Sequence, residues 1–271
     1  MTTYYKNFKN KTAIITGGAS GLGAGIAKIL AEQGAIISLI DINSSNLQKT
    51  KKTIDSIGNE SSTYVCDVTN IDEVTKTISL IEKDMNKIDI LVNAAGVIGA
   101  GKLENLETSS LEDWDATYSI NVKGTAIVTE EVASKMKKNN YGKIINISSH
   151  GGKYPNPDNP AYAASKAAVI NLTQSFAMKW AKNNINVNVL CPGSIWTPMW
   201  EKNAEKTKQN DKSKSHMTPR EIFLKFIDDN CPMQREQTTE DIGNAVAFFA
   251  SDNSLNITGQ SLNINGGTIM D

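Results

Sequence analysis

Two residues one helical turn apart, Tyr162 and Lys166, carry the clearest chemistry in this sequence. Residues i and i+4 share a helix face, so the amine of Lys166 is expected beside the phenol of Tyr162. Tyrosine is a poor base at neutral pH because its reference pKa is about 10. A nearby ammonium group favours the phenolate and lowers that pKa, which would let Tyr162 act as a general acid or base. Alone, the pair would equally fit an exposed helix face.

Hydroxyl groups follow a short apolar run at residues 143–147, which predicts a β-strand that ends at Ser148 and Ser149. Ligands of open α/β sheets bind at the carboxyl ends of the strands, so either hydroxyl could meet a substrate. His150 comes next, and it either contacts that substrate or is a solvent-exposed loop residue. Neither His150 nor His216 has metal-ligand spacing, and no metal is predicted.

A glycine-rich turn follows the first apolar run of the chain, with the sequence TGGASGLG at residues 16–23. Glycines at such a strand-to-helix turn allow the backbone to approach a pyrophosphate, and the helix N-terminus attracts the negative charge. A purely structural turn is the alternative. The turn residues expected to bind a dinucleotide are Gly17, Ser20, Gly21, Leu22 and Gly23.

An acidic residue, Asp41, ends the second apolar run, 18 positions after Gly23. An acid at about this spacing accepts hydrogen bonds from the adenosine ribose and repels a 2′-phosphate. Neither Ser20 nor Ile42, which flank the expected site, is basic. The pattern therefore predicts NAD rather than NADP, although Asp41 would also fit a helix N-cap.

Two further strand ends should lie beside the adenosine. Asp67 and Val68 end the third run, where the carboxylate could hydrogen-bond the adenine amino group or simply form a turn. The fourth run ends in the sequence NAAG, which places Asn93, Ala94 and Gly96 at the same edge of the sheet.

The elements that must position these residues alternate along the chain. Ile- and Val-rich runs typical of strands buried on both faces occur at 12–16, 36–40, 64–66, 88–92, 144–147, 187–190 and 262–264. Helical spacing occupies 22–33, 45–57, 72–85, 111–138, 161–182 and 240–250. This order predicts one α/β domain over residues 1–271, a doubly wound Rossmann-type fold with about seven parallel strands and helices on both faces. The long polar insertion at about 198–230 predicts a substrate lid.

Composition narrows the functional classes. The chain has 271 residues, with 28 Lys and Arg against 29 Asp and Glu, so a formal charge of −1 argues against nucleic acid as a partner. No apolar run approaches the length that spans a bilayer, and the polar segment 1–11 lacks a signal-peptide core. The three cysteines are scattered, which favours a reducing compartment and a cytoplasmic protein.

Together these motifs resemble the short-chain dehydrogenase/reductase family over essentially the whole chain. The matching positions are the turn at 16–23, Asp41, Asp67, the NAAG sequence at 93–96, Asn121, Ser149, Tyr162, Lys166 and Pro192-Gly193. The family places its serine 13 residues before the tyrosine, so Ser149 rather than Ser148 is the match. One departure is Ala94, where many members have asparagine.

The resemblance implies roles for these residues. Tyr162 would be the general acid/base, Lys166 would tune it and hold the nicotinamide ribose, and Ser149 would bind the substrate oxygen. Asn121 would bend its helix and hold a proton-relay water. The nicotinamide carboxamide would be bound by a segment that includes Pro192, Gly193, Ile195 and Thr197. The implied reaction interconverts a secondary alcohol and a ketone, and the implied assembly is a homotetramer formed through the helices at 111–138 and 161–182.

The substrate is expected to meet large apolar residues of the lid, among them Trp196, Met199 and Trp200, unless these pack on the core. A local charge of +2 over 201–215 would suit an amphipathic anion such as a bile acid, or it is a solvated loop. Residues 192–200 also resemble the hydroxysteroid and sugar dehydrogenases of the family. A hydroxysteroid is therefore ranked first and a sugar or polyol second. A non-catalytic dinucleotide-binding regulator is the alternative of another class.

Overall fold

The computed structural model describes residues 8–100 and 109–270, so the start of the polar N-terminal segment lies outside the described residues. Its centre is a seven-stranded parallel sheet in the order β3-β2-β1-β4-β5-β6-β7, which confirms the predicted fold class. The strands are β1 (Thr12–Thr16), β2 (Ile36–Asp41), β3 (Ser61–Val65), β4 (Ile90–Asn93), β5 (Gly142–Ile147), β6 (Ile185–Pro192) and β7 (Ser261–Ile264). The chain order reverses between β1 and β4, which opens a crevice at the carboxyl ends of these strands.

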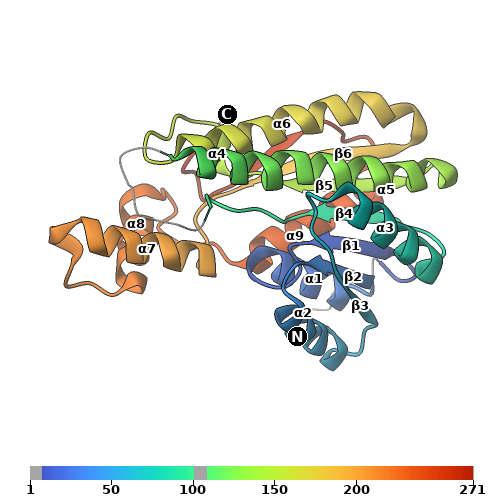
Figure 1. The fold of residues 1–271 in the computed structure, drawn as a ribbon, viewed down its shortest axis with the longest axis horizontal. Helices are drawn as coiled ribbons and strands as arrows, with labels where there is room; N and C mark the ends of the chain where they lie inside the picture. Colours follow the sequence, from blue (N-terminus) through green and yellow to red (C-terminus); the bar gives the residue numbers. More distant parts are fainter. Residues whose placement is uncertain (1–7, 101–108, 271) are drawn as a thin grey trace.

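Helices cover both faces of the sheet (Figure 1). The helices are α1 (Gly21–Glu32), α2 (Ser44–Ser56), α3 (Ile71–Met85), α4 (Leu111–Thr117), α5 (Thr125–Asn139), α6 (Pro160–Trp180), α7 (Pro198–Asn210), α8 (Pro219–Asn230) and α9 (Thr239–Ala250). One apolar core lies between the sheet and α1, α2 and α9, and the other lies between the sheet and α3, α5 and α6. Among the described residues, no helix is both long and apolar enough to traverse a bilayer.

The strand residues divide between the two cores because successive side chains point to opposite faces. Ile15 and Ile37 pack towards α1, whereas Ile14 and Ile40 pack towards α3 and α5. All five residues of β1 are buried. Burial on both faces explains the uninterrupted apolar runs in the sequence.

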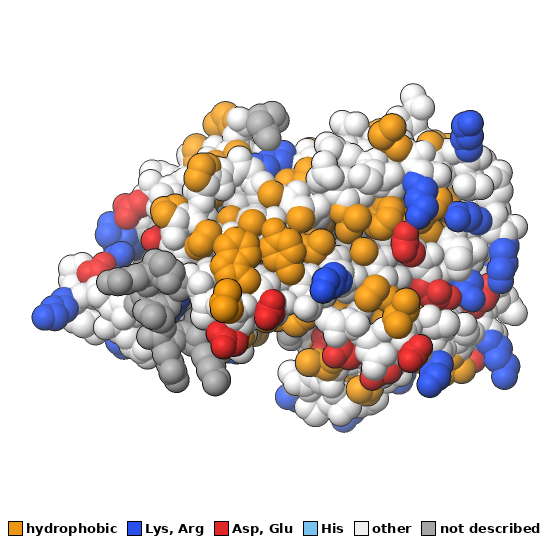
Figure 2. All heavy atoms as spheres, turned by 45° about the horizontal axis from the view of Figure 1, so that its top comes forward, with side chains coloured by type: hydrophobic (Ala, Val, Ile, Leu, Met, Phe, Trp, Pro, Cys, Tyr) orange, Lys and Arg blue, Asp and Glu red, His pale blue; other side chains and the backbone are white. Residues whose placement is uncertain are grey.

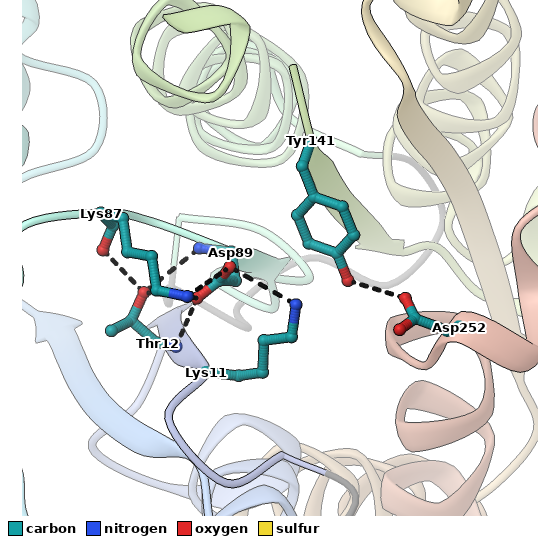
Figure 3. Close-up of polar contacts among 6 residues, drawn as sticks. All are labelled: Lys11, Thr12, Lys87, Asp89, Tyr141 and Asp252. Carbon is teal, nitrogen blue, oxygen red and sulfur yellow. Dashed lines mark hydrogen bonds and ion pairs between the residues drawn. The ribbon is translucent and has the colours of Figure 1, made fainter. Parts of the chain in front are cut away.

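A polar cluster closes the amino end of the sheet, opposite the crevice (Figure 3). The Asp89 carboxylate, 4% exposed, accepts a hydrogen bond from the Thr12 backbone N–H at 3.0 Å. It also pairs with Lys87 at 3.1 Å and with Lys11 at 3.7 Å. A buried carboxylate is stable only when it is paired in this way, so Asp89 links β1 to β4.

Two segments were predicted only in outline, since the resemblance implied a bend at Asn121 and no helix was predicted within the insertion. The helix expected at 111–138 is interrupted by a π-helical turn at Tyr118–Gly124, between α4 and α5. The polar insertion at 198–230 forms two helices, α7 and α8, which project from one end of the molecule (orange in Figure 1). Both begin with a threonine N-cap followed by proline at the first helical position, an arrangement that favours helix initiation.

Candidate active site

The predicted proton-transfer residues meet at the carboxyl end of β5. Ser149 follows this strand, and Tyr162 lies in the first turn of α6, where Asn159 caps the helix by accepting a hydrogen bond from the Tyr162 N–H at 3.1 Å. Tyr162 and Ser149 are hydrogen-bonded through their side chains. The Lys166 ammonium lies 5.7 Å from the centre of the Tyr162 ring and donates to the Ile147 carbonyl at 3.0 Å. The expected juxtaposition of serine, tyrosine and lysine is therefore present.

Burial changes the acidity of both groups. It raises the pKa of Tyr162, and the hydrogen bond with Ser149 only partly offsets this effect. It also lowers the pKa of Lys166 to about 8, because an ammonium group is costly to bury. In the protein without a bound cofactor, the burial of Tyr162 and Lys166 thus opposes formation of the Tyr162 phenolate, which the sequence argument favours. A cationic group bound beside Tyr162 would act in the opposite direction.

Asn121 lies in the π-helical turn behind these residues. Its side-chain amide donates to the Val97 carbonyl and to Ser165 Oγ, both at 2.9 Å, and its oxygen accepts from the Val97 N–H at 2.8 Å. These bonds tie the segment after β4 to α6. Asn121 is buried at 1% exposure and does not line the cleft, so its contacts are to protein groups that frame the site.

A single cleft of about 1200 Å³ runs from Ser149 and Tyr162 to the glycine turn. A side chain at Gly23 would place its Cβ 2.2 Å from the Gly17 carbonyl oxygen, and one at Gly17 would meet Ala94 at 2.8 Å. At these two positions the turn therefore packs so closely that only glycine fits. Ser20, the N-cap of α1, makes no side-chain hydrogen bond to the first turn of the helix, so the N–H groups there can receive an anion. This cradle fits a pyrophosphate. The predicted residues of this turn, Gly17, Ser20, Gly21, Leu22 and Gly23, all line the cleft.

Asp41 and Ile42 stand at the far side of the glycine turn. The Asp41 carboxylate accepts hydrogen bonds from the Ala19 N–H at 3.2 Å and the Asn43 N–H at 2.9 Å, which fix its position against the turn. Ile42 is 72% exposed and lines the cleft beside it. Asn43, rather than Asp41, is the N-cap of α2.

The residues that follow β3 and β4 contribute unequally to the lining of the cleft. Asp67 and Val68 line the cleft, although Asp67 also forms a turn by accepting from the N–H and hydroxyl of Thr69, each at 2.8 Å. Ala94 and Gly96 line the cleft as well. The side chain of Asn93 instead points into the core, where it donates to Thr129 Oγ1 at 2.8 Å. A direct cofactor contact by the Asn93 side chain is therefore not supported, because strand alternation turns it away from its neighbour Ala94.

The segment after β6 forms one wall of the cleft, with Pro192, Gly193, Ile195 and Thr197 among its lining residues. The Gly193 N–H donates to the side chain of Gln237 at 2.9 Å, which holds this wall against the end of the sheet. Thr197 Oγ1 accepts from the Trp200 N–H at 3.4 Å and caps α7. The same threonine thus belongs both to the cleft wall and to the start of the lid.

The outer part of the cleft contains three of the predicted substrate residues, His150, Met199 and Trp200. Trp196 does not line it. Its ring packs 5.3 Å from that of Phe223 and 5.1 Å from the Arg220 guanidinium, so Trp196 joins α8 to the body of the protein. For Trp196, packing against other protein residues is therefore observed in place of the expected substrate contact. Ile195 and Thr197, on either side of it, line the cleft instead.

Further residues of the loop after Ser149 and of the lid, the two segments expected to meet the substrate, also line the outer cleft. Tyr154 lies edge-on to His150, with ring centres 5.6 Å apart, and Phe226 comes from α8. Lys214 and Lys225 also line the cleft, but each pairs with a carboxylate at 3.0 Å, on Asp211 and Asp229 respectively. Two lysines of the outer cleft are therefore paired, and Lys206 of the expected basic mouth lines the cleft as well. Phe226 was among the apolar residues expected there, whereas Lys225 and Asp229 of α8 were not singled out from the sequence.

Comparison with known proteins places this geometry in a family. The family described as enoyl-(acyl carrier protein) reductase matches residues 17–268. The 3-oxoacyl-(acyl-carrier-protein) reductase FabG of Thermotoga maritima is 36% identical over 262 residues, or 97% of this chain and 99% of that protein. The chain belongs to the short-chain dehydrogenase/reductase family. It is accordingly an oxidoreductase that acts on alcohol or keto groups with a nicotinamide dinucleotide.

Solved structures of this family include close matches to the fold. An NAD⁺-bound xylitol dehydrogenase superposes with a TM-score of 0.86 at 33% identity, covering 96% of this chain and 99% of that one. An actinorhodin polyketide ketoreductase with NADPH gives a TM-score of 0.87 at 27% identity, covering 98% and 99%. Because the two carry different dinucleotides, the likeness of fold alone does not assign the cofactor of this short-chain dehydrogenase/reductase.

Proposed function

We propose that this short-chain dehydrogenase/reductase interconverts a secondary alcohol and a ketone, with Tyr162 as the general acid/base and NAD as the cofactor. One observation carries the proposal. The cleft that holds Tyr162, Ser149 and Lys166 at one end continues to a glycine cradle and a carboxylate, Asp41, at the other. A dinucleotide bound along it would present its nicotinamide to the tyrosine.

The proposed chemistry rests on the protonation of Tyr162. The bound dinucleotide accepts a hydride from an alcohol or supplies one to a ketone. In the oxidation, the Tyr162 phenolate takes the hydroxyl proton, and in the reduction the phenol returns it. Ser149 Oγ already accepts a hydrogen bond from the Gly151 N–H at 3.0 Å, so its own proton can be donated to the substrate oxygen.

Lys166 and Asn121 would support this chemistry. Lys166 would bind the nicotinamide ribose and, when charged, favour the phenolate of Tyr162. Gly96 leaves room for it, since a Cβ there would lie 3.3 Å from the lysine nitrogen and 3.2 Å from Asn121 Oδ1. Asn121 would hold the segment after β4 in place against α6, in addition to the proton-relay role that the family implies.

The choice of NAD rests on Asp41 and on the residues around it. A fixed carboxylate at the ribose end binds two hydroxyl groups and repels a 2′-phosphate. Ile42 and Ser20 line the same end of the cleft and supply no positive charge to hold such a phosphate.

The substrate that we rank first is a hydroxysteroid such as a bile acid. Trp200, Phe226 and Met199 offer the outer cleft an apolar wall suited to a large ring system. The second candidate is a sugar or polyol, favoured by Asn156 and Asn203 in the same part of the cleft and by the likeness to xylitol dehydrogenase. The helical pair α7 and α8 would form the lid over either substrate.

Purified protein with NAD⁺ and a panel of hydroxysteroids, polyols and 3-hydroxyacyl thioesters tests these rankings through the appearance of NADH. Oxidation of steroids supports the first choice, and oxidation of free polyols alone reverses the order. Binding of NAD⁺ without turnover of any compound would instead favour a non-catalytic regulator. The presence of both Tyr162 and Lys166 argues against that alternative.

We also propose a homotetramer assembled through the helices α4, α5 and α6. Hydrophobic side chains gather over the middle of the face that these helices form (Figure 2). The helices carry Leu111 at 80% and Met178 at 85% exposure. Apolar surface of this kind favours association. Light scattering that reports four times the chain mass is expected, and a monomer would contradict it.

A further inference from the structure

His150 combines burial with an unused polar atom at the substrate end of the cleft. The residue is 9% exposed, lines the cleft, and follows Ser149 directly. Its Nδ1 atom is buried and has no hydrogen-bond partner within residues 8–100 and 109–270. Because Nδ1 is enclosed by protein, Nε2 is the ring nitrogen that can reach a molecule in the cleft.

Close packing fixes the position of the imidazole. The short turn His150–Gly152 lies directly on α6, where a side chain at Gly152 would place its Cβ 2.7 Å from the Lys166 carbonyl carbon. The Tyr154 ring stands nearly perpendicular to the imidazole, at 80°, with the ring centres 5.6 Å apart. The turn that carries His150 is therefore held against α6, and its imidazole is nearly buried rather than free to turn into solvent.

The environment also fixes which nitrogen carries the proton. Burial lowers the pKa of His150, so the ring is neutral and has one N–H group. A buried N–H without an acceptor is rarer than a buried acceptor without a donor. The proton is therefore best placed on Nε2, with unpaired Nδ1 left as the bare acceptor. Because His150 lines the cleft, Nε2–H is the group that a bound molecule would meet.

We propose that His150 is a specificity residue whose Nε2–H donates a hydrogen bond to a second oxygen of the substrate, close to the carbon that reacts. This inference rests on the proposed function, because it assumes that Ser149 and Tyr162 bind the first oxygen. It narrows the substrate class to alcohols that carry a neighbouring hydroxyl, ether or carbonyl oxygen, whether the carbon skeleton is a steroid or a polyol.

Matched pairs of alcohols test the proposal. Cyclohexanol is compared with trans-cyclohexane-1,2-diol, and estradiol with estriol, because each pair differs by one hydroxyl next to the reacting carbon. The measured quantity is kcat/KM for each diol divided by kcat/KM for its partner, with NAD⁺ saturating. Wild-type protein is expected to favour the diol in at least one pair, and His150→Leu is expected to lower that ratio about 10- to 100-fold.

Two conservative variants separate the hydrogen bond from the shape of the residue. Glutamine can place its amide N–H near the position of Nε2, whereas asparagine reaches only the position of Nδ1. We expect His150→Gln to recover most of the ratio and His150→Asn to resemble His150→Leu. His216→Leu, at an exposed histidine outside the cleft, is the matched control and should leave the ratio unchanged.

The outcomes distinguish this proposal from the function on which it rests. Turnover by the wild type with no preference for either diol, or with a preference that His150→Leu retains, overturns the role of His150 and leaves the proposed reaction intact. Absence of turnover on all four alcohols, with NAD⁺ bound, counts against both. Recovery by asparagine rather than glutamine would contradict the assignment of the proton to Nε2.

Discussion

Replacing Asp41 with alanine should change which dinucleotide the enzyme prefers. The carboxylate is held by the Ala19 and Asn43 N–H groups, and its remaining lone pairs face the cleft. Loss of hydrogen bonds from a ribose to this charged group would weaken NAD binding by about 1.5–3 kcal/mol. Loss of the repulsion between the carboxylate and a doubly charged phosphate about 5 Å away would favour NADP by roughly 1.5 kcal/mol in a water-like dielectric.

These two effects act in the same direction. Their sum, about 3–4.5 kcal/mol, corresponds to a fall of roughly 100- to 2000-fold in the ratio of kcat/KM for NAD⁺ to that for NADP⁺. The assay is initial-rate kinetics with each dinucleotide at a fixed, saturating alcohol concentration. A ratio that changes less than threefold in Asp41→Ala would refute the assignment of Asp41 to the ribose.

A second variant controls for the structural part of the effect, since Asp41 also supports the glycine turn. Asp41→Asn removes the charge but keeps one oxygen that can accept from a backbone N–H. We expect this variant to lose the discrimination against NADP⁺ while its melting temperature stays near that of the wild type. If both variants lose all dinucleotide binding together with stability, the carboxylate serves the turn rather than the ribose.

Two further expectations concern pH and stability. Because burial raises the pKa of Tyr162, the phenolate needed for oxidation accumulates only as pH rises. The value of kcat/KM for alcohol oxidation should therefore increase from pH 7 to pH 10, while that for ketone reduction should fall. Parallel pH profiles in the two directions would contradict the role of Tyr162. Asp89→Ala should lower the free energy of unfolding in urea by about 3 kcal/mol, because it leaves the buried Thr12 N–H without its acceptor. Lys87→Ala removes an ion pair from a side chain that is 44% exposed, so it should lower the free energy of unfolding by less than about 1 kcal/mol. Neither change should alter kcat/KM, since the cluster lies where β1 and β4 begin, whereas the cleft lies at their carboxyl ends. Equal losses of stability in the two variants would refute the stated role of Asp89.

The sheet could be predicted from the sequence because its signal is local. Each strand is a short apolar run that is buried on both faces, and residues 12–16 coincide with β1. The cleft residues at the strand ends followed from the same pattern, because parallel strands bring their carboxyl ends together. The i to i+4 spacing of Tyr162 and Lys166 likewise needs only helix geometry.

Other features depend on tertiary contacts that no local pattern reports. Asn93 and Trp196 carry chemistry that suits a binding site, yet the alternation of the extended chain turns the first towards Thr129 and the second towards Phe223. The π-helical turn around Asn121 arises where its side chain bonds Val97 and Ser165, which lie far away in the sequence. The start of α8 does have a local signal in the sequence, since Thr218 and Glu221, three residues apart, form a capping box.

The central claim is that the Tyr162 phenol moves the substrate proton. It is tested most directly by measuring kcat for alcohol oxidation in Tyr162→Phe, which removes one oxygen and keeps the ring, with NAD⁺ affinity measured in parallel. The account predicts a loss of about 100- to 10,000-fold in kcat with the affinity for NAD⁺ little changed. A variant that retains a tenth or more of the wild-type rate would contradict it.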